Sequence, residues 1–193
     1  MPVDENSVFL NVPFDSSYEK QFLALIATLI ALGRRPRCVL ELPDGGEGRL
    51  NRIISHIQSC RVSLHDLSRA TRLNMPFELG IACAVARLNS QHDFYVLQRE
   101  DCRLDRKLSD LKGVDHSTHH GTIRGTIGCV LDVLHSIQDN PDIKSAYSLY
   151  RDLDQLARAL KRSYRKKHIF TRSMFGQLVI GAATLAQEGG LID

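Results

Sequence analysis

The sequence predicts an α/β fold: a flavodoxin/Rossmann-like three-layer sandwich with a parallel sheet of four or five strands, plus a helical appendage at the C-terminus. Two observations indicate this class. Short runs rich in β-forming residues alternate with segments whose apolar residues recur at helical spacing. Each strand segment is followed by a single helix, which requires right-handed crossovers between parallel strands with helices on both faces of the sheet.

The first half of the chain holds four expected strands and three expected helices. The strand segments are short apolar runs, and they are residues 7–12, 37–42, 61–67 and 93–97. The helical segments place an apolar residue every three or four positions, and they are residues 18–32, 49–60 and 75–88. Gly33 is expected to end the first of these helices.

The second half begins with a polar loop at 99–121, with a short helix near 104–111 and a weak fifth strand near Val114. A helix is expected at 122–137, and Asn140-Pro141 marks a boundary. We therefore expect an α/β domain at 1–140 and a helical extension at 141–193. The extension has two helices, at 143–167 and 173–187, which either pack on the domain or form an oligomer contact.

Composition and charge give no indication of a membrane protein and, by themselves, none of a nucleic-acid-binding protein. Apolar residues make up 43% and charged residues 24% of the 193 residues, as in globular proteins. No apolar run approaches the roughly 18–20 residues that span a bilayer, and the acidic N-terminus lacks the basic region of a signal peptide. We expect a cytoplasmic protein without a membrane partner. The net charge of +3 is too small to indicate nucleic acid by itself.

Cysteine and histidine patterns give little support for a metal site. The five cysteines include no CxxC pair, and Cys38, Cys60, Cys83 and Cys129 lie in apolar contexts typical of buried, reduced thiols. Residues 115–120 contain three histidines, but a metal needs three or four convergent ligands. That segment is more typical of a loop that lines a ligand pocket or is solvated. No resident metal or cofactor is expected.

Ligands of open parallel sheets bind at the carboxyl ends of the strands. The loops that begin there are rich in polar residues beside proline. The residues expected to line a small-molecule site are Asn11, Pro13, Phe14, Asp15, Ser68, Asn74 and Met75. The GxGxxG pattern is absent, which disfavours hydride transfer.

Glu78 is the residue on which the functional hypothesis depends most. Pro76 fits the first turn of a helix, so Glu78 is expected in that turn, where the helix dipole favours the ionised carboxylate. A carboxylate near a sugar C1 can act as a nucleophile or stabilise an oxocarbenium-like transition state. The alternative is that Glu78 only caps the helix.

Asp66 ends a buried strand and enters the same loop. Its carboxylate can hold ribose hydroxyls, or it can form an Asx turn as the chain leaves the strand. His65 precedes it, and strand alternation points the two side chains to opposite faces, so a catalytic His65–Asp66 pair is not expected.

The segments VFLNVPFD and HDLSRATRLNMPFELGIA together resemble the nucleoside 2-deoxyribosyltransferase family and its structural relatives, the Toll/interleukin-receptor (TIR) domains that cleave NAD. The resemblance covers residues 7–97 and suggests a stand-alone bacterial member. It implies that Glu78 is catalytic and that Asp66 contacts the ribose. It also implies that Gly80 and Ala82 let their helix pack close to the sheet. Both groups of enzymes complete their sites by assembly, which implies a homo-oligomer.

One departure affects the expected substrate. The transferases carry an Asp-x-Gly-Thr element before the glutamate, where this chain has Leu73-Asn74-Met75-Pro76, and TIR domains also lack that element. The leading prediction is therefore cleavage of the N-glycosidic bond of a nucleotide, with NAD the first candidate as substrate. The alternatives are a nucleoside 2-deoxyribosyltransferase and a non-catalytic nucleotide-binding or TIR-type signalling scaffold. In the enzyme hypothesis Phe14 stacks on a base, and Ser68 and Asn74 add hydrogen bonds.

Two groups of cations remain. Arg49, Arg52 and His56 follow one another at helical spacing, and either bind a phosphate or form a solvated face. The basic run at 161–167 either contacts nucleic acid or an acidic partner, or is the solvated end of a helix, where cations are favoured. For this basic run we favour the solvated helix end, so nucleic acid is not an expected partner.

Overall fold

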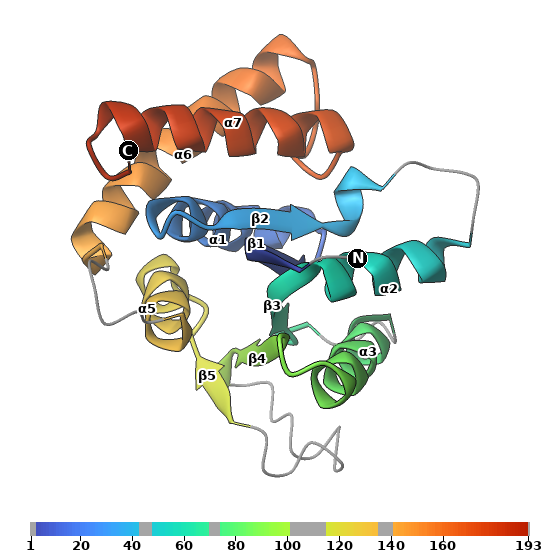
Figure 1. Ribbon diagram of the computed structural model, residues 1–193. Coiled ribbons are helices and arrows are strands. Elements are labelled where there is room, and N and C mark those ends of the chain that lie inside the picture. The colour runs from blue at the N-terminus through green and yellow to red at the C-terminus, as the bar shows by residue number, and fades with distance from the viewer. Residues whose placement is uncertain (1–2, 43–47, 70–73, 101–114, 135–140, 193) are drawn as a thin grey trace. The chain divides into compact units, whose positions relative to one another are not determined.

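The computed structural model describes residues 3–42, 48–69, 74–100, 115–134 and 141–192, and these contain a five-stranded parallel sheet (Figure 1). The strands are β1 (Asp4–Asn11), β2 (Arg35–Cys38), β3 (Cys60–Asp66), β4 (Asp93–Gln98) and β5 (His116–Thr118). Their order across the sheet is β2-β1-β3-β4-β5, the order of flavodoxin-like folds. The predicted α/β class and parallel sheet are confirmed, and a fifth strand is present two residues beyond Val114.

Helices account for most of the remaining described residues. They are α1 (Glu19–Ala31), α2 (Arg49–Ser59), α3 (Asn74–Leu88), α5 (Ile123–Val133), α6 (Ile143–Ser163) and α7 (Arg172–Glu188). The predicted helical C-terminal part is confirmed by α6 and α7. The predicted short helix near 104–111 and the end of the helix at 122–137 lie outside the described residues.

The chain divides into two compact units, each formed from two segments. One consists of Met1–Pro13 and Arg37–Gly121, and the other of Phe14–Pro36 and Thr122–Asp193. The first unit holds most of the sheet with α2 and α3, and the second holds α1 with α5, α6 and α7. The domain boundary expected at 140/141 stays a prediction.

The packing of α3 identifies one face of the sheet in the first unit. Leu67 and Val96 form a buried cluster with Met75 and Leu79 of α3. Asn11, His65 and Val96 are register partners on β1, β3 and β4, so their side chains share that face. Asp66 follows His65 along β3 and therefore projects from the opposite face.

Strand β2 corrects one predicted boundary. The strand expected at 37–42 begins at Arg35 and ends at Cys38, and a short 3₁₀ helix (η2, Val39–Glu41) follows it. Glu41 causes the change, because its carboxylate accepts the backbone N–H of Cys38 at 3.0 Å and pairs with Arg37 at 2.7 Å. These bonds turn the chain before the apolar residues Val39 and Leu40 can extend the strand.

Three helices of the second unit, α1, α6 and α7, end with the Schellman motif, whose C′ residue has a positive φ. Gly33 after α1 (φ 65°) and Gly190 after α7 (φ 65°) occupy that position. After α6 the position is occupied by Arg165 (φ 50°). The helix predicted at 143–167 therefore ends four residues early, at Ser163, without the glycine that would have marked its end.

Two expectations from composition concern the cysteines and membranes. Cys38, Cys60, Cys83 and Cys129 are free thiols, and all but the partly buried Cys83 are buried, as predicted. No helix within the described residues has the length and apolar character needed to cross a membrane.

Candidate functional site at the carboxyl edge of the sheet

The sheet order places a topological switch point between β1 and β3, where ligands of open α/β sheets bind beyond the carboxyl ends of the strands. Asn11 ends β1, Asp66 ends β3 and Gln98 ends β4. All three side chains are buried. The polar groups at this edge belong to the first unit, and they divide between the two faces of the sheet.

A buried hydrogen-bonded chain runs along the α3 face. Asn11 Nδ2 donates to the Met75 carbonyl oxygen and to His65 Nδ1, both at 2.9 Å. His65 Nε2 lies 2.9 Å from Ser63 Oγ, which lies 3.0 Å from His92 Nε2. His92 Nδ1 lies 2.9 Å from the carbonyl oxygen of Cys60. Because Met75 is in α3, this chain connects the helix to β1 and β3.

The two carbonyl groups fix the direction of every hydrogen bond in this chain. The Cys60 carbonyl only accepts, so His92 Nδ1 carries a hydrogen and its Nε2 accepts from the Ser63 hydroxyl. The Ser63 oxygen then accepts from His65 Nε2–H, and His65 Nδ1 accepts from the Asn11 amide. Each polar atom named in the chain is satisfied with both imidazoles neutral.

The pKa directions agree with this assignment. Burial, with a smaller contribution from the neighbouring His92, lowers the pKa of His65 to about 3. Burial also lowers the pKa of His92. Two neutral imidazoles bound on both ring nitrogens are not proton donors or acceptors for a substrate, so we assign them to positioning Asn11 and α3.

A second cluster lies on the face from which Asp66 projects. Asp66 Oδ1 accepts the backbone N–H of Ser68 at 2.8 Å, which is the Asx turn considered as the alternative role of Asp66. Asp66 Oδ2 lies 3.2 Å from His119 Nε2, and Ser68 Oγ lies 2.8 Å from the same nitrogen. The backbone N–H of Gly121 donates to His119 Nδ1 at 3.1 Å.

This cluster contains the residue types of a serine-hydrolase triad but not its geometry. In a triad the serine and the aspartate contact different nitrogens of the histidine. Here both approach Nε2, while Nδ1 accepts the Gly121 N–H, so the hydrogen must lie on Nε2 and the ring cannot take the serine proton there. The cluster holds the loops after β3 and β5 together. A role of Asp66 toward a ribose stays a prediction, because both of its carboxylate oxygens already have protein partners.

Glu78 differs from these satisfied groups. It is 9% exposed, and no hydrogen bond or ion pair to it is found among the described residues. Burial raises the pKa of Glu78 to about 7, and the charge of Arg49 on α2 opposes that rise. A carboxyl group without a protein partner, poised near neutral pH, is available to a ligand.

The position of Glu78 in its helix corrects the sequence prediction. Helix α3 begins at Asn74, and its first turn contains no acidic residue, so Glu78 lies in the second turn. The prediction placed Glu78 too close to the helix start because Pro76 is tolerated there as the third helical residue. Desolvation, rather than the dipole of the first turn, therefore determines the charge of this carboxyl group.

Gln98 was not among the site residues predicted from the sequence. Like Glu78, it is a buried residue at this edge with a side-chain oxygen that has no hydrogen-bond partner among the described residues. Its side chain is 6% exposed, and its Oε1 atom is buried with no hydrogen-bond donor among the described residues. It follows Val96 by two positions and therefore lies on the α3 face. The rule that selected Asn11 and Asp66, a polar residue that ends a strand, also applies to Gln98.

The other predicted site residues have several environments. Ser68 and Pro13 are buried, Met75 packs its side chain in the core, and Asn74 is the exposed first residue of α3. Phe14 and Asp15 belong to the second unit, where Phe14 packs against Phe22 and Phe170 and Asp15 caps the 3₁₀ helix η1 (Ser16–Tyr18). Their roles toward a ligand stay predictions.

Ser63 and His92 were not selected from the sequence, and His119 was considered only as part of the loop at 115–120. Each has a partner at least 29 positions away. Within the described part of the chain, no group of three or more His, Cys, Asp or Glu side chains is arranged to hold a metal. No protein-family model and no curated protein matches this chain.

Proposed function

We propose that the first unit cleaves the N-glycosidic bond of a nucleotide, with NAD as the leading substrate and Glu78 as the catalytic carboxyl group. The observation that supports this most is the buried Glu78 carboxyl, which has no protein hydrogen-bond partner in the described structure and a pKa of about 7. The resemblance to deoxyribosyltransferases and TIR domains assigns the catalytic role to the same position. The switch-point location of the site also supports a small-molecule ligand.

The ionised form of Glu78 carries out the proposed chemistry. Its negative charge stabilises the positive charge that develops at the sugar C1 as the base leaves with the electrons of the C–N bond. Nicotinamide leaves NAD as a neutral molecule, so this step needs no proton donor. Water then adds to C1 and loses a proton, which completes hydrolysis.

Gln98 is proposed as a substrate-binding residue. Its unsatisfied Oε1 is a hydrogen-bond acceptor at the same strand edge, and a ribose hydroxyl or an amide N–H of the ligand would supply the missing donor. Asn11 has a positioning role, because its amide bonds to Met75 and His65 fix the start of α3 and therefore the direction of Glu78.

The test is release of nicotinamide from NAD, and of free base from a panel of nucleotides and nucleosides, by wild type and Glu78→Gln. Glu188→Gln, which removes an exposed acid at the end of α7, is the matched control. We expect wild type and Glu188→Gln to release base equally, and Glu78→Gln to lose at least about 100-fold in rate. Equal turnover by Glu78→Gln would contradict the proposal. Binding without turnover by wild type would favour a nucleotide sensor instead.

A further inference from the structure

The basic run at 161–167 extends beyond the end of α6. Residues 155–187 contain seven lysines and arginines and no aspartate or glutamate. Because α6 ends at Ser163, only Lys161 and Arg162 lie in its last turn, where the helix dipole favours cations. Arg165, Lys166 and Lys167 lie in the turn before α7, and Arg172 is the first residue of α7. The dipole therefore does not explain four of these cations.

Two of the cations occupy positions at which they lower the stability of the folded chain. Arg165 adopts φ 50°, the left-handed conformation that glycine occupies after α1 and α7. A non-glycine residue there is strained. Arg172 places a positive charge at the N-terminal end of α7, which the helix dipole disfavours. Positive charges at positions that are unfavourable for the backbone or the helix dipole indicate a role other than folding.

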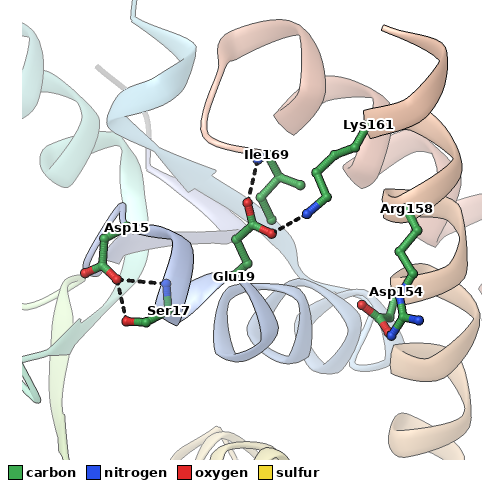
Figure 2. A network of polar contacts seen from close by, with 7 residues as sticks. All are labelled: Asp15, Ser17, Glu19, Asp154, Arg158, Lys161 and Ile169. Atoms are coloured by element: carbon green, nitrogen blue, oxygen red, sulfur yellow. Dashed lines mark hydrogen bonds and ion pairs between the residues drawn. The ribbon is translucent and has the colours of Figure 1, made fainter. Parts of the chain in front are cut away.

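Contacts with Glu19 of α1 hold the turn between α6 and α7 in place. Figure 2 shows the Glu19 carboxylate between Lys161 and Ile169: it accepts from Lys161 Nζ at 2.7 Å and from the backbone N–H of Ile169 at 3.0 Å. Ile169 is fully buried, and the Phe170 ring packs against Phe22. Residues 162–168 between these anchors are all exposed.

Most cations of the turn have no acidic partner among the described residues. Lys161 pairs with Glu19 and Arg158 pairs with Asp154, as Figure 2 shows. Within the described structure no carboxylate pairs with the remaining cations, which are Arg162, Arg165, Lys166, Lys167 and Arg172. Tyr164 is 52% exposed among them. The exposed surface formed by Arg162, Tyr164, Arg165, Lys166, Lys167 and Arg172 is called the basic turn below.

We propose that the basic turn binds single-stranded nucleic acid. Its cations match a repeating phosphate backbone, and an exposed aromatic ring beside arginines is the arrangement on which unpaired bases stack. A membrane surface is the less suitable partner, because Tyr164 is the only large exposed apolar side chain of the basic turn. This inference is independent of the function proposed for the first unit.

The experiment measures binding of the full chain to a fluorescent oligothymidylate and an oligouridylate of about 20 nucleotides. The key variant is Arg165→Gly, because glycine suits φ 50° and keeps the turn intact. We expect Arg165→Gly to unfold at an equal or higher temperature than wild type and to bind at least about fivefold more weakly, with a shallower dependence on salt. Tyr164→Ala should weaken binding by about fivefold or more, and Tyr164→Phe should bind nearly as wild type.

Lys144→Gln is the matched control, since it removes an exposed cation from the other end of the same helix. It should bind as wild type. The proposal is overturned if wild type does not bind either oligonucleotide, or if Arg165→Gly binds as tightly as wild type. It is also overturned if Lys144→Gln weakens binding as much as Arg165→Gly, or if only vesicles of anionic lipid are bound.

Discussion

At the scale of single residues, the carboxyl edge contains satisfied and unsatisfied polar groups, and this contrast separates structural from functional roles. Asn11, His65 and Ser63 each bond to protein groups, and so do Asp66 and His119. A buried polar group without a partner costs stability, which is tolerated where a ligand supplies the partner. Glu78 and Gln98 are the residues of this kind described at this edge.

Gln98→Leu tests this reasoning because it should change stability and ligand binding in opposite directions. Removing an unsatisfied buried acceptor should raise the free energy of unfolding by about 1–2 kcal/mol. The Kd or KM for the nucleotide should rise about tenfold, since a donor on the ligand loses its acceptor. Urea denaturation and a nucleotide titration measure the two effects. Gln91→Leu, at an exposed turn position, serves as the control and should change neither.

The outcome that would contradict this role of Gln98 is a destabilised Gln98→Leu protein with unchanged nucleotide affinity. That result would mean that Gln98 has a structural partner in solution and does not contact the ligand.

At the scale of elements, the turn after β5 positions the cluster around Asp66. His120 and Gly121 both have positive φ values, 53° and 66°, and the Gly121 N–H fixes the tautomer of His119. A Cβ atom on residue 121 would lie 2.7 Å from Arg99 Nε. Glycine is therefore favoured at position 121 mainly for its conformation, and a Cβ there would also displace the end of the exposed Arg99 side chain.

Gly121→Ala should lower the free energy of unfolding by about 1–3 kcal/mol, through the strained backbone and the displacement of Arg99. Gly48→Ala is the control, because a Cβ at residue 48 meets no atom within 4 Å and its φ is negative. Urea denaturation compares the two variants. An equal, small effect of both would contradict the account of this turn.

Sequence patterns predicted the elements that depend on local signals. The period of Phe22, Leu25 and Leu29 indicated α1, and Gly33 indicated its end. The same logic failed after α6, where Arg165 takes the position of a glycine, and after Cys38, where Glu41 turns the backbone. The two failures have different causes: the Glu41 carboxylate turns the backbone after Cys38, whereas α6 ends at a left-handed residue that is not the expected glycine.

The candidate site was predictable only in part. The rule for open parallel sheets selected Asn11 and Asp66, and the alternation of β3 correctly separated His65 from Asp66. The sequence could not show that Asp66 would be engaged by His119 or that His65 would be linked to His92 through Ser63, because His119 and His92 are far from these partners along the chain. It also could not show which carboxyl groups would be left without partners.

At the scale of the whole molecule, Glu78 and His65 should affect the pH dependence of stability in opposite directions. The folded pKa of Glu78, about 7, lies above its ordinary value of 4.5, so its contribution is present below pH 4.5 and is lost as the pH rises through 7. The folded pKa of His65, about 3, lies below 6.5, so its contribution is lost as the pH falls from 6.5 toward 3. The two effects cancel between pH 4.5 and 6.5.

Glu78→Gln should therefore expose the effect of His65. Between about pH 5 and 6.5, the free energy of unfolding of this variant should increase with pH about 1.4 kcal/mol per pH unit more steeply than that of wild type. At about pH 8 the variant should be more stable than wild type by about 3 kcal/mol. Urea denaturation across this pH range measures both quantities. Parallel curves for the two proteins would show that Glu78 titrates normally.

If the ionised, buried Glu78 carboxylate promotes cleavage of the N-glycosidic bond, base release must depend on pH in the same way as the charge of Glu78. The measurement is kcat/KM for nicotinamide release from NAD, or for the best substrate of the panel, between about pH 5 and 9. We expect kcat/KM to rise with pH and to level off above a pKa near 7, the value of Glu78. A rate that has no inflection near 7, or that Glu78→Gln retains in full, would contradict it.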